Sequence, residues 1–155
     1  MTRVFIQLAT AFAGSLGFCL VFHLRKQLLL LAGIGSILCW SVYLIGENFF
    51  TSAFVPCLIA SGVAALYAEI LARIKKAPAT LFVVTAILPL IPGSKLYYTM
   101  SNIVQKEWDM AKEYGLQTAE YALAIACGIS FVWAVCVMIQ NVLNKWKENK
   151  RTCSF

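Results

Sequence analysis

The sequence predicts an all-α protein, a polytopic membrane helix bundle of about five transmembrane helices in a single integral membrane domain, residues 1–155. Composition is the first observation: 61% of the 155 residues are hydrophobic and 13% are charged, about half the charged share of an average soluble domain. The second is that the apolar residues form several runs close to the roughly 20 residues needed to cross a bilayer core. The third is that lysine and arginine gather between these runs, where membrane proteins carry their orientation signals.

The first predicted span is residues 4–22, an apolar run followed directly by a basic cluster. A cleaved signal peptide is the alternative, but only Arg3 precedes the run as a positive charge and no convincing small-residue cleavage site follows it. We therefore expect an uncleaved helix. Its small residues Ala13, Gly14 and Gly17 are expected to let a neighbouring helix approach closely within the bundle.

The second and third predicted spans are residues 28–45 and 49–71, joined by a short polar turn. Glu69 stands out near the end of the third span, because a carboxylate in a membrane helix is costly unless it pairs, snorkels or serves a function. Two interpretations of Glu69 stay open: pairing with the nearby Arg73, and a proton-carrying role.

The fourth predicted span, residues 79–103, contains a break. Pro89 and Pro92 each lack a backbone donor and clash with the preceding turn, and Gly93 can adopt dihedrals that other residues avoid. In hydrocarbon, freed backbone groups are tolerated only where protein or a water-filled cavity satisfies them, and transporters build substrate sites from such interrupted helices. The break at Pro89–Gly93 is therefore the first candidate for function. Lys95 lies beside it, and its ammonium must snorkel, pair with an acid or face a wet cavity.

Beyond residue 103 the chain alternates charged and apolar side chains, which fits an amphipathic segment on the membrane surface or a solvated loop. The fifth predicted span is residues 118–143, with Glu120 at its entrance, and a cytoplasmic basic tail of residues 144–155 follows it. Glu69 and Glu120 are the acids available for ion coupling, although neither is central in its span.

Lysine and arginine are distributed unevenly between the two sides of the predicted bundle. One side holds nine: Arg25, Lys26, Arg73, Lys75, Lys76, Lys145, Lys147, Lys150 and Arg151. The other side holds three: Arg3, Lys106 and Lys112. Under the positive-inside rule, this bias places the N-terminus outside and the C-terminus in the cytoplasm.

Several function classes are disfavoured. The six cysteines form no CxxC pair and have no histidine in ligand spacing, so no metal site is expected and packing explains them better. The chain has no Walker loop, dinucleotide-binding glycine pattern or nucleophile elbow, so we expect no catalytic residues, no cofactor and no enzyme activity. Despite the net charge of +6, no basic face remains for nucleic acid.

The segment ILPLIPGSKLYYTM, residues 87–100, resembles the proline-proline-glycine-tyrosine signature of the threonine/serine exporter (ThrE) family in its small-subunit type. Two further segments resemble the same family: FHLRKQLLLLAGIGSIL after the first span, and YAEILARIKKAPATLFVVTAILPLIPG from the third span into the fourth. The signature positions that match are Pro89, Pro92, Gly93 and Tyr97. Ser94 and Lys95 are added to these four, so the candidate substrate-binding or gating set is Pro89, Pro92, Gly93, Ser94, Lys95 and Tyr97.

The resemblance implies a subunit of a secondary transporter in the cell membrane of a prokaryote, embedded in the lipid bilayer. It implies export of small hydrophilic metabolites, threonine and serine in some members and a dicarboxylate such as succinate in others. It also implies a larger partner subunit, because family members either fuse a larger half to one like this or split the halves between two chains. Half-helix ends at the break then suit the substrate, since amino ends favour a carboxylate and carbonyl ends a cation. A non-transporting membrane scaffold or regulator is the alternative, in which the break is only a packing kink.

Overall fold

The computed structural model describes residues 2–22 and 26–152, and every regular element in these ranges is helical. The elements are α1 (Thr2–Val21), α2 (Lys26–Phe49), α3 (Phe54–Lys75), α4 (Ala79–Ile87), a 3-10 turn η1 (Leu88–Leu90), α5 (Gly93–Val104) and α6 (Trp108–Thr152). Helices α1, α2, α3 and α6 are each long and apolar enough to cross a membrane, and α4 with α5 makes a fifth crossing if the bent pair is one span. The prediction of a polytopic all-α bundle is confirmed.

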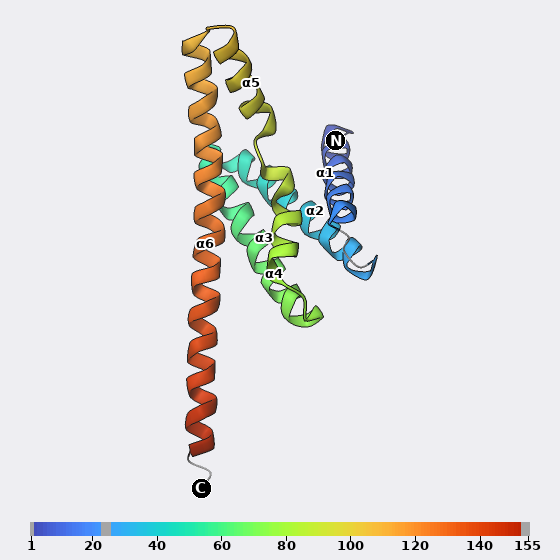
Figure 1. Ribbon diagram of the computed structural model, residues 1–155, viewed down its shortest axis with the longest axis vertical. Coiled ribbons are helices and arrows are strands. Elements are labelled where there is room, and N and C mark those ends of the chain that lie inside the picture. The colour runs from blue at the N-terminus through green and yellow to red at the C-terminus, as the bar shows by residue number, and fades with distance from the viewer. Residues whose placement is uncertain (1, 23–25, 153–155) are drawn as a thin grey trace.

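Helix α3 lies at the centre of the bundle, where it packs against α2, α4 and α6. Helix α1 packs against α2, and α5 packs against the first turns of α6 (Figure 1). The direction of the chain alternates from one crossing to the next, so that α1 and α6 run the same way along the long axis (Figure 1). An odd number of crossings is consistent with this arrangement.

Small side chains let the helices come close together at the centre of the bundle. Along α3 a buried alanine recurs every fourth residue, at Ala60, Ala64, Ala68 and Ala72. One face of α3 therefore carries only methyl groups at these positions, so neighbouring helices can approach its backbone, as is typical of membrane bundles.

Hydroxyl groups link neighbouring helices across this core. The Ser15 hydroxyl of α1 donates to the backbone carbonyl of Thr85 in α4 at 3.1 Å. The Tyr67 hydroxyl of α3 donates to the carbonyl of Leu31 in α2 at 2.8 Å. A third hydroxyl, that of Ser61, bonds within α3 and also lies 3.5 Å from a carbonyl of α6. These contacts satisfy buried polar groups without placing a charge between the helices.

The structure differs from the sequence-based prediction between residues 104 and 117. Only Gln105–Glu107 separates α5 from α6, and α6 then continues as one helix from Trp108 instead of forming a separate surface segment or loop. Lysine and glutamate are good helix formers, so the charged residues at its start do not end the helix. At about 1.5 Å per residue, this 45-residue helix is about 67 Å long, roughly twice the thickness of a bilayer core.

The small residues of α1 also differ from expectation. Ala13, Gly14 and Gly17 are exposed. A Cβ built on either glycine would meet nothing within 4 Å. Neither glycine therefore brings a neighbouring helix into close contact in the described chain, whereas Phe12 of α1 lies against Gly33 of α2.

Candidate functional site

The predicted break in the fourth span is present. Helix α4 ends at Ile87, the turn η1 contains Pro89, and α5 begins at Gly93 after Pro92. The two helical parts are bent by 60°. Gly93 does not use its conformational freedom at this break, because no glycine in the described ranges has a positive φ and Gly93 already belongs to α5. The two prolines are therefore the residues whose local chemistry explains the bend.

Local hydrogen bonds satisfy part of the broken backbone. The amide of Ile91 donates to the carbonyl of Leu88 at 3.3 Å, and the amide of Gly93 donates to the carbonyl of Ile91 at 2.8 Å. Leu96 donates to Pro92 at 3.0 Å, which closes the first turn of α5. The amides at the start of a helix have no acceptor within the helix, so the amino end of α5 carries partial positive charge.

Lys95, in that first turn, is held by α6. Its Nζ donates to Oε1 of Gln117, and it lies 5.9 Å from the centre of the Tyr121 ring. An ammonium over an aromatic face is attracted by the ring quadrupole. The hydroxyl oxygens of Tyr121 and Tyr43 are in turn 2.8 Å apart. The half-buried Lys95 side chain is therefore paired within the chain.

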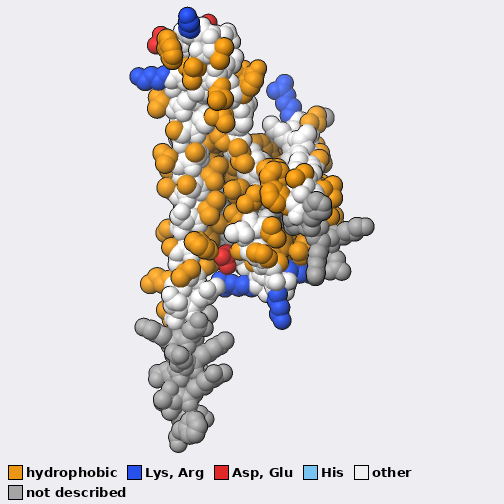
Figure 2. All heavy atoms as spheres, viewed as in Figure 1, with side chains coloured by type: hydrophobic (Ala, Val, Ile, Leu, Met, Phe, Trp, Pro, Cys, Tyr) orange, Lys and Arg blue, Asp and Glu red, His pale blue; other side chains and the backbone are white. Residues whose placement is uncertain are grey.

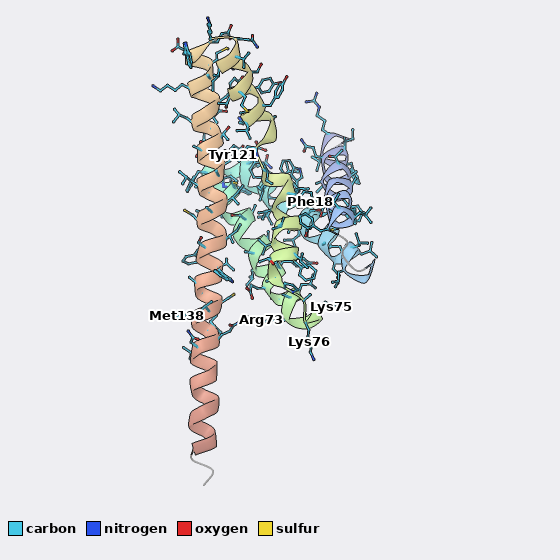
Figure 3. The ribbon with its side chains drawn as sticks, viewed as in Figure 1. Phe18, Arg73, Lys75, Lys76, Tyr121 and Met138 are labelled. Carbon is cyan, nitrogen blue, oxygen red and sulfur yellow. The ribbon has the colours of Figure 1, made fainter. Side chains whose placement is uncertain are left out.

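Glu120 lies on the same stretch of α6. Its Oε1 accepts a hydrogen bond of 2.9 Å from the Ser52 hydroxyl, in the connection between α2 and α3. Gln117, Glu120 and Tyr121 are spaced i, i+3 and i+4, so they share one face of the helix. We call Lys95, Gln117, Glu120, Tyr121 and Tyr43 the polar cluster. Figure 3 shows Tyr121 on α6 close to the level at which α5 begins.

Pro89 faces a different region, an open groove of about 350 Å³ between α1, α2 and η1. The groove is lined by Gln7, Thr10, Ala11, Gly14, Trp40, Leu88 and Pro89. The indole nitrogen of Trp40 is buried and has no acceptor among the described residues. The Trp40 ring stacks on Tyr43 with centroids 5.1 Å apart, and Tyr43 contacts Tyr121. A chain of three aromatic side chains thus connects the groove to the polar cluster.

The remaining candidate residues lie elsewhere. Tyr97 is 68% exposed, and its ring meets Tyr98 edge-on at 5.7 Å, so it faces away from the polar cluster. Ser94 is exposed at the amino end of α5. Glu69 lies 3.4 Å from the guanidinium of Arg73, at the end of the bundle that Figure 3 shows near Met138. The structure therefore brings Lys95 and Glu120 into one region and leaves Glu69 and Tyr97 outside it.

The sequence analysis did not select several residues that complete this region: Tyr43, Ser52, Gln117 and Tyr121 in the contacts above, and Trp40 beside the groove. The sequence contains part of the signal for these residues. Gln117, Glu120 and Tyr121 place polar atoms on one face at the start of the fifth predicted span, and the residues that follow are mostly apolar. The contact with Lys95 could not be read from that spacing, since it depends on the turn between α5 and α6.

One family model matches the chain over residues 7–135, and it is described as "Threonine/Serine exporter, ThrE". The match covers most of the chain and includes the break, the groove and the polar cluster. No curated protein and no solved structure matches the chain. The matched family is one of transporters, and the long apolar helices agree with a membrane protein. The chain belongs to the threonine/serine exporter family, ThrE.

Proposed function

We propose that this chain is one subunit of a secondary transporter that exports small hydrophilic metabolites, acting with a larger partner subunit. The observation that carries the proposal is the family match over residues 7–135, which includes the whole of the broken span. Threonine and serine are the first substrates to test, and a dicarboxylate such as succinate is the other substrate class that the sequence resemblance implies.

The polar cluster supports a substrate site for an amino acid. The Lys95 ammonium and the amino end of α5 offer two positive partners for a carboxylate. Glu120, on the same face of α6 as Gln117, offers an anion for the substrate ammonium. A dicarboxylate would place its second negative charge near Glu120, so this arrangement favours a zwitterion. Glu120 is also the better candidate for ion coupling, because Glu69 is already paired with Arg73.

The shape of the groove supports the need for a partner. On the Pro89 side the groove is open along α1, and its α1 residues Gln7 and Thr10 are exposed. An export pathway must shield a hydrophilic substrate from lipid, because polar groups without partners are costly in hydrocarbon. We propose that the larger subunit closes the pathway here and that the break faces it.

An efflux assay tests the proposed function. Cells loaded with labelled threonine, serine or succinate would express one of three combinations: the wild-type chain alone, the wild-type chain with its larger partner, or the Lys95→Met variant with that partner. We expect efflux only from the pair, and at least about a tenfold loss in Lys95→Met, since a hydrogen bond to a charged group contributes about 1.5–3 kcal/mol. Lys112→Met is the matched control. Lys112 is exposed on α6, so this variant should export at the wild-type rate.

Each result of this assay has a defined meaning at equal membrane abundance. Export by the single chain would contradict partner dependence. Wild-type export by Lys95→Met would remove Lys95 from the substrate site. A pair that exports neither threonine, serine nor succinate would favour the scaffold or regulatory alternative.

We also propose that the chain lies in the cell membrane of a prokaryote with its N-terminus outside and its C-terminus in the cytoplasm. The nine-to-three bias of lysine and arginine supports this orientation. Figure 2 shows charged side chains gathered toward two ends of a largely apolar surface. Reporter fusions should place Lys147 in the cytoplasm and Glu47 outside. An external signal from the Lys147 fusion would mean that the orientation or the number of crossings is wrong.

A further inference from the structure

A second cavity lies between α3, α4 and α6, apart from the break. Its volume is about 440 Å³. Its walls are mostly apolar and include Val83, Val84, Ile129 and Val132, with Trp133 of α6 64% exposed at its edge. Few side chains there could hydrogen-bond a hydrophilic metabolite, so this cavity does not suit the exported substrate. An apolar chain fits it better.

Three basic residues, Arg73, Lys75 and Lys76, lie close in the chain to the cavity residues Glu69 and Pro78, although they do not line the cavity themselves. Glu69 lines the cavity with a carboxylate, and the guanidinium of Arg73 lies 3.4 Å from that carboxylate. Arg73 and Lys75 belong to the last turn of α3, Lys76 follows the helix, and both lysines are exposed. Three cations and one carboxylate leave a local net charge of +2. Figure 3 shows these three basic residues together at one end of the bundle.

The amino end of α4 adds to this positive charge. Ala79 and Thr80 line the cavity, and Pro78, the residue before the helix, makes no side-chain cap. The amino end of α4, where an anion is favoured, therefore lies at the cavity and follows the basic residues in the chain. An apolar cavity with a cationic end matches a molecule with an apolar chain and an anionic head.

We propose that this cavity binds an anionic phospholipid, with an acyl chain between α4 and α6 and its phosphate near Lys75, Lys76 and the amino end of α4. Basic pockets between transmembrane helices are a known way of holding anionic headgroups. A zwitterionic lipid would gain less from the net positive charge, and free phosphate would leave the apolar walls empty. The site is independent of the proposed export function, because it uses none of the polar cluster.

Lipid binding by the purified chain tests this proposal. Native mass spectrometry in detergent would compare phosphatidylglycerol with phosphatidylcholine carrying the same acyl chains. We expect the anionic lipid to bind more tightly to the wild type. The double variant Lys75→Gln, Lys76→Gln should weaken its binding about 30-fold, which corresponds to about 1 kcal/mol per lysine. Phosphatidylcholine binding should change little.

The matched control is Lys106→Gln, Lys112→Gln. Both pairs are exposed, and Lys76 and Lys106 both have left-handed backbone, with φ of 49° and 63°, so the two double variants carry the same backbone cost. The control lies near acidic residues such as Glu107 and Asp109 and should keep the lipid preference of the wild type. Equal losses in the two double variants would show a general surface-charge effect and overturn the proposed site.

A further variant tests the cavity itself. Ile129→Trp fills it from α6 and leaves both lysines in place, so binding of both lipids should fall while gel filtration and helical content stay as in the wild type. Unchanged lipid binding in this variant would overturn the acyl-chain assignment. Displacement of phosphatidylglycerol by inorganic phosphate would show that the site binds an anion only. Equal binding of the two lipids by the wild type would show that the site does not select an anionic lipid.

Discussion

Gly128→Leu is expected to give a protein that does not form a stable bundle. A Cβ at residue 128 would lie 2.6 Å from the carbonyl oxygen of Leu58 and 3.1 Å from the amide nitrogen of Gly62, and both atoms are backbone of α3. It would also clash with the Ser61 hydroxyl. Backbone atoms cannot move aside as a side-chain end can, so α6 must shift away from the central helix. Overpacking usually costs about 1–3 kcal/mol, and a rigid backbone contact should exceed that range.

The matched control for this prediction is Gly14→Leu. Gly14 is also a glycine inside a membrane helix, but a Cβ there meets nothing within 4 Å. Its effect on stability should therefore stay within about 0.5 kcal/mol, as for surface substitutions. The measurement is the thermal midpoint and monodispersity of each purified variant in the same detergent. Equal stability of the two variants would mean that α6 does not cross α3 at Gly128.

The second large effect is expected at the break. Replacing Pro89 and Pro92 with alanine together restores two amide donors, and each replacement favours a continuous helix by about 3 kcal/mol. The protein should therefore remain stable. A straight α4–α5 helix would remove the 60° bend and carry the first turn of α5 away from α6, which separates Lys95 from Gln117 and Tyr121. Export by the variant, expressed with the proposed partner subunit, should fall to the background of cells without the transporter.

The control for the double alanine variant is Pro78→Ala. Pro78 precedes α4 and lies outside the break, so its loss should leave export close to that of the wild type. Efflux would be measured for both variants at matched membrane abundance. Wild-type efflux from the double alanine variant would show that the bend is a packing kink and that the substrate path lies elsewhere.

The helices and the break could be predicted from the sequence because both depend on local chemistry. Apolar runs of bilayer length form helices in a membrane whatever their neighbours are. Pro89 and Pro92 interrupt a helix through their own rings and missing donors. The continuity of α6 could not be predicted, because the charged residues from Lys106 onward are compatible with a helix, a surface segment or a loop.

The site was only partly predictable, because its contacts join distant residues. Lys95 and Gln117 are 22 positions apart and meet only because the chain turns at Gln105–Glu107. Small residues show the same limit. Gly14 and Gly128 look alike in an apolar run, yet only at Gly128 would an added Cβ meet another helix in the described structure. A residue type gives the capacity for a contact, and the arrangement of helices decides whether the contact forms.

The hydroxyl contacts of the core have a consequence for the response to acid. The bonds that link α1 to α4, α2 to α3 and α3 to α6 run from serine or tyrosine hydroxyls to backbone carbonyls. Neither group gains or loses a proton between pH 4 and pH 9 in ordinary surroundings, as tyrosine ionises near pH 10. A change of pH therefore leaves these three links intact. The contacts between these helices can therefore be the same on both sides of a membrane that carries a proton gradient.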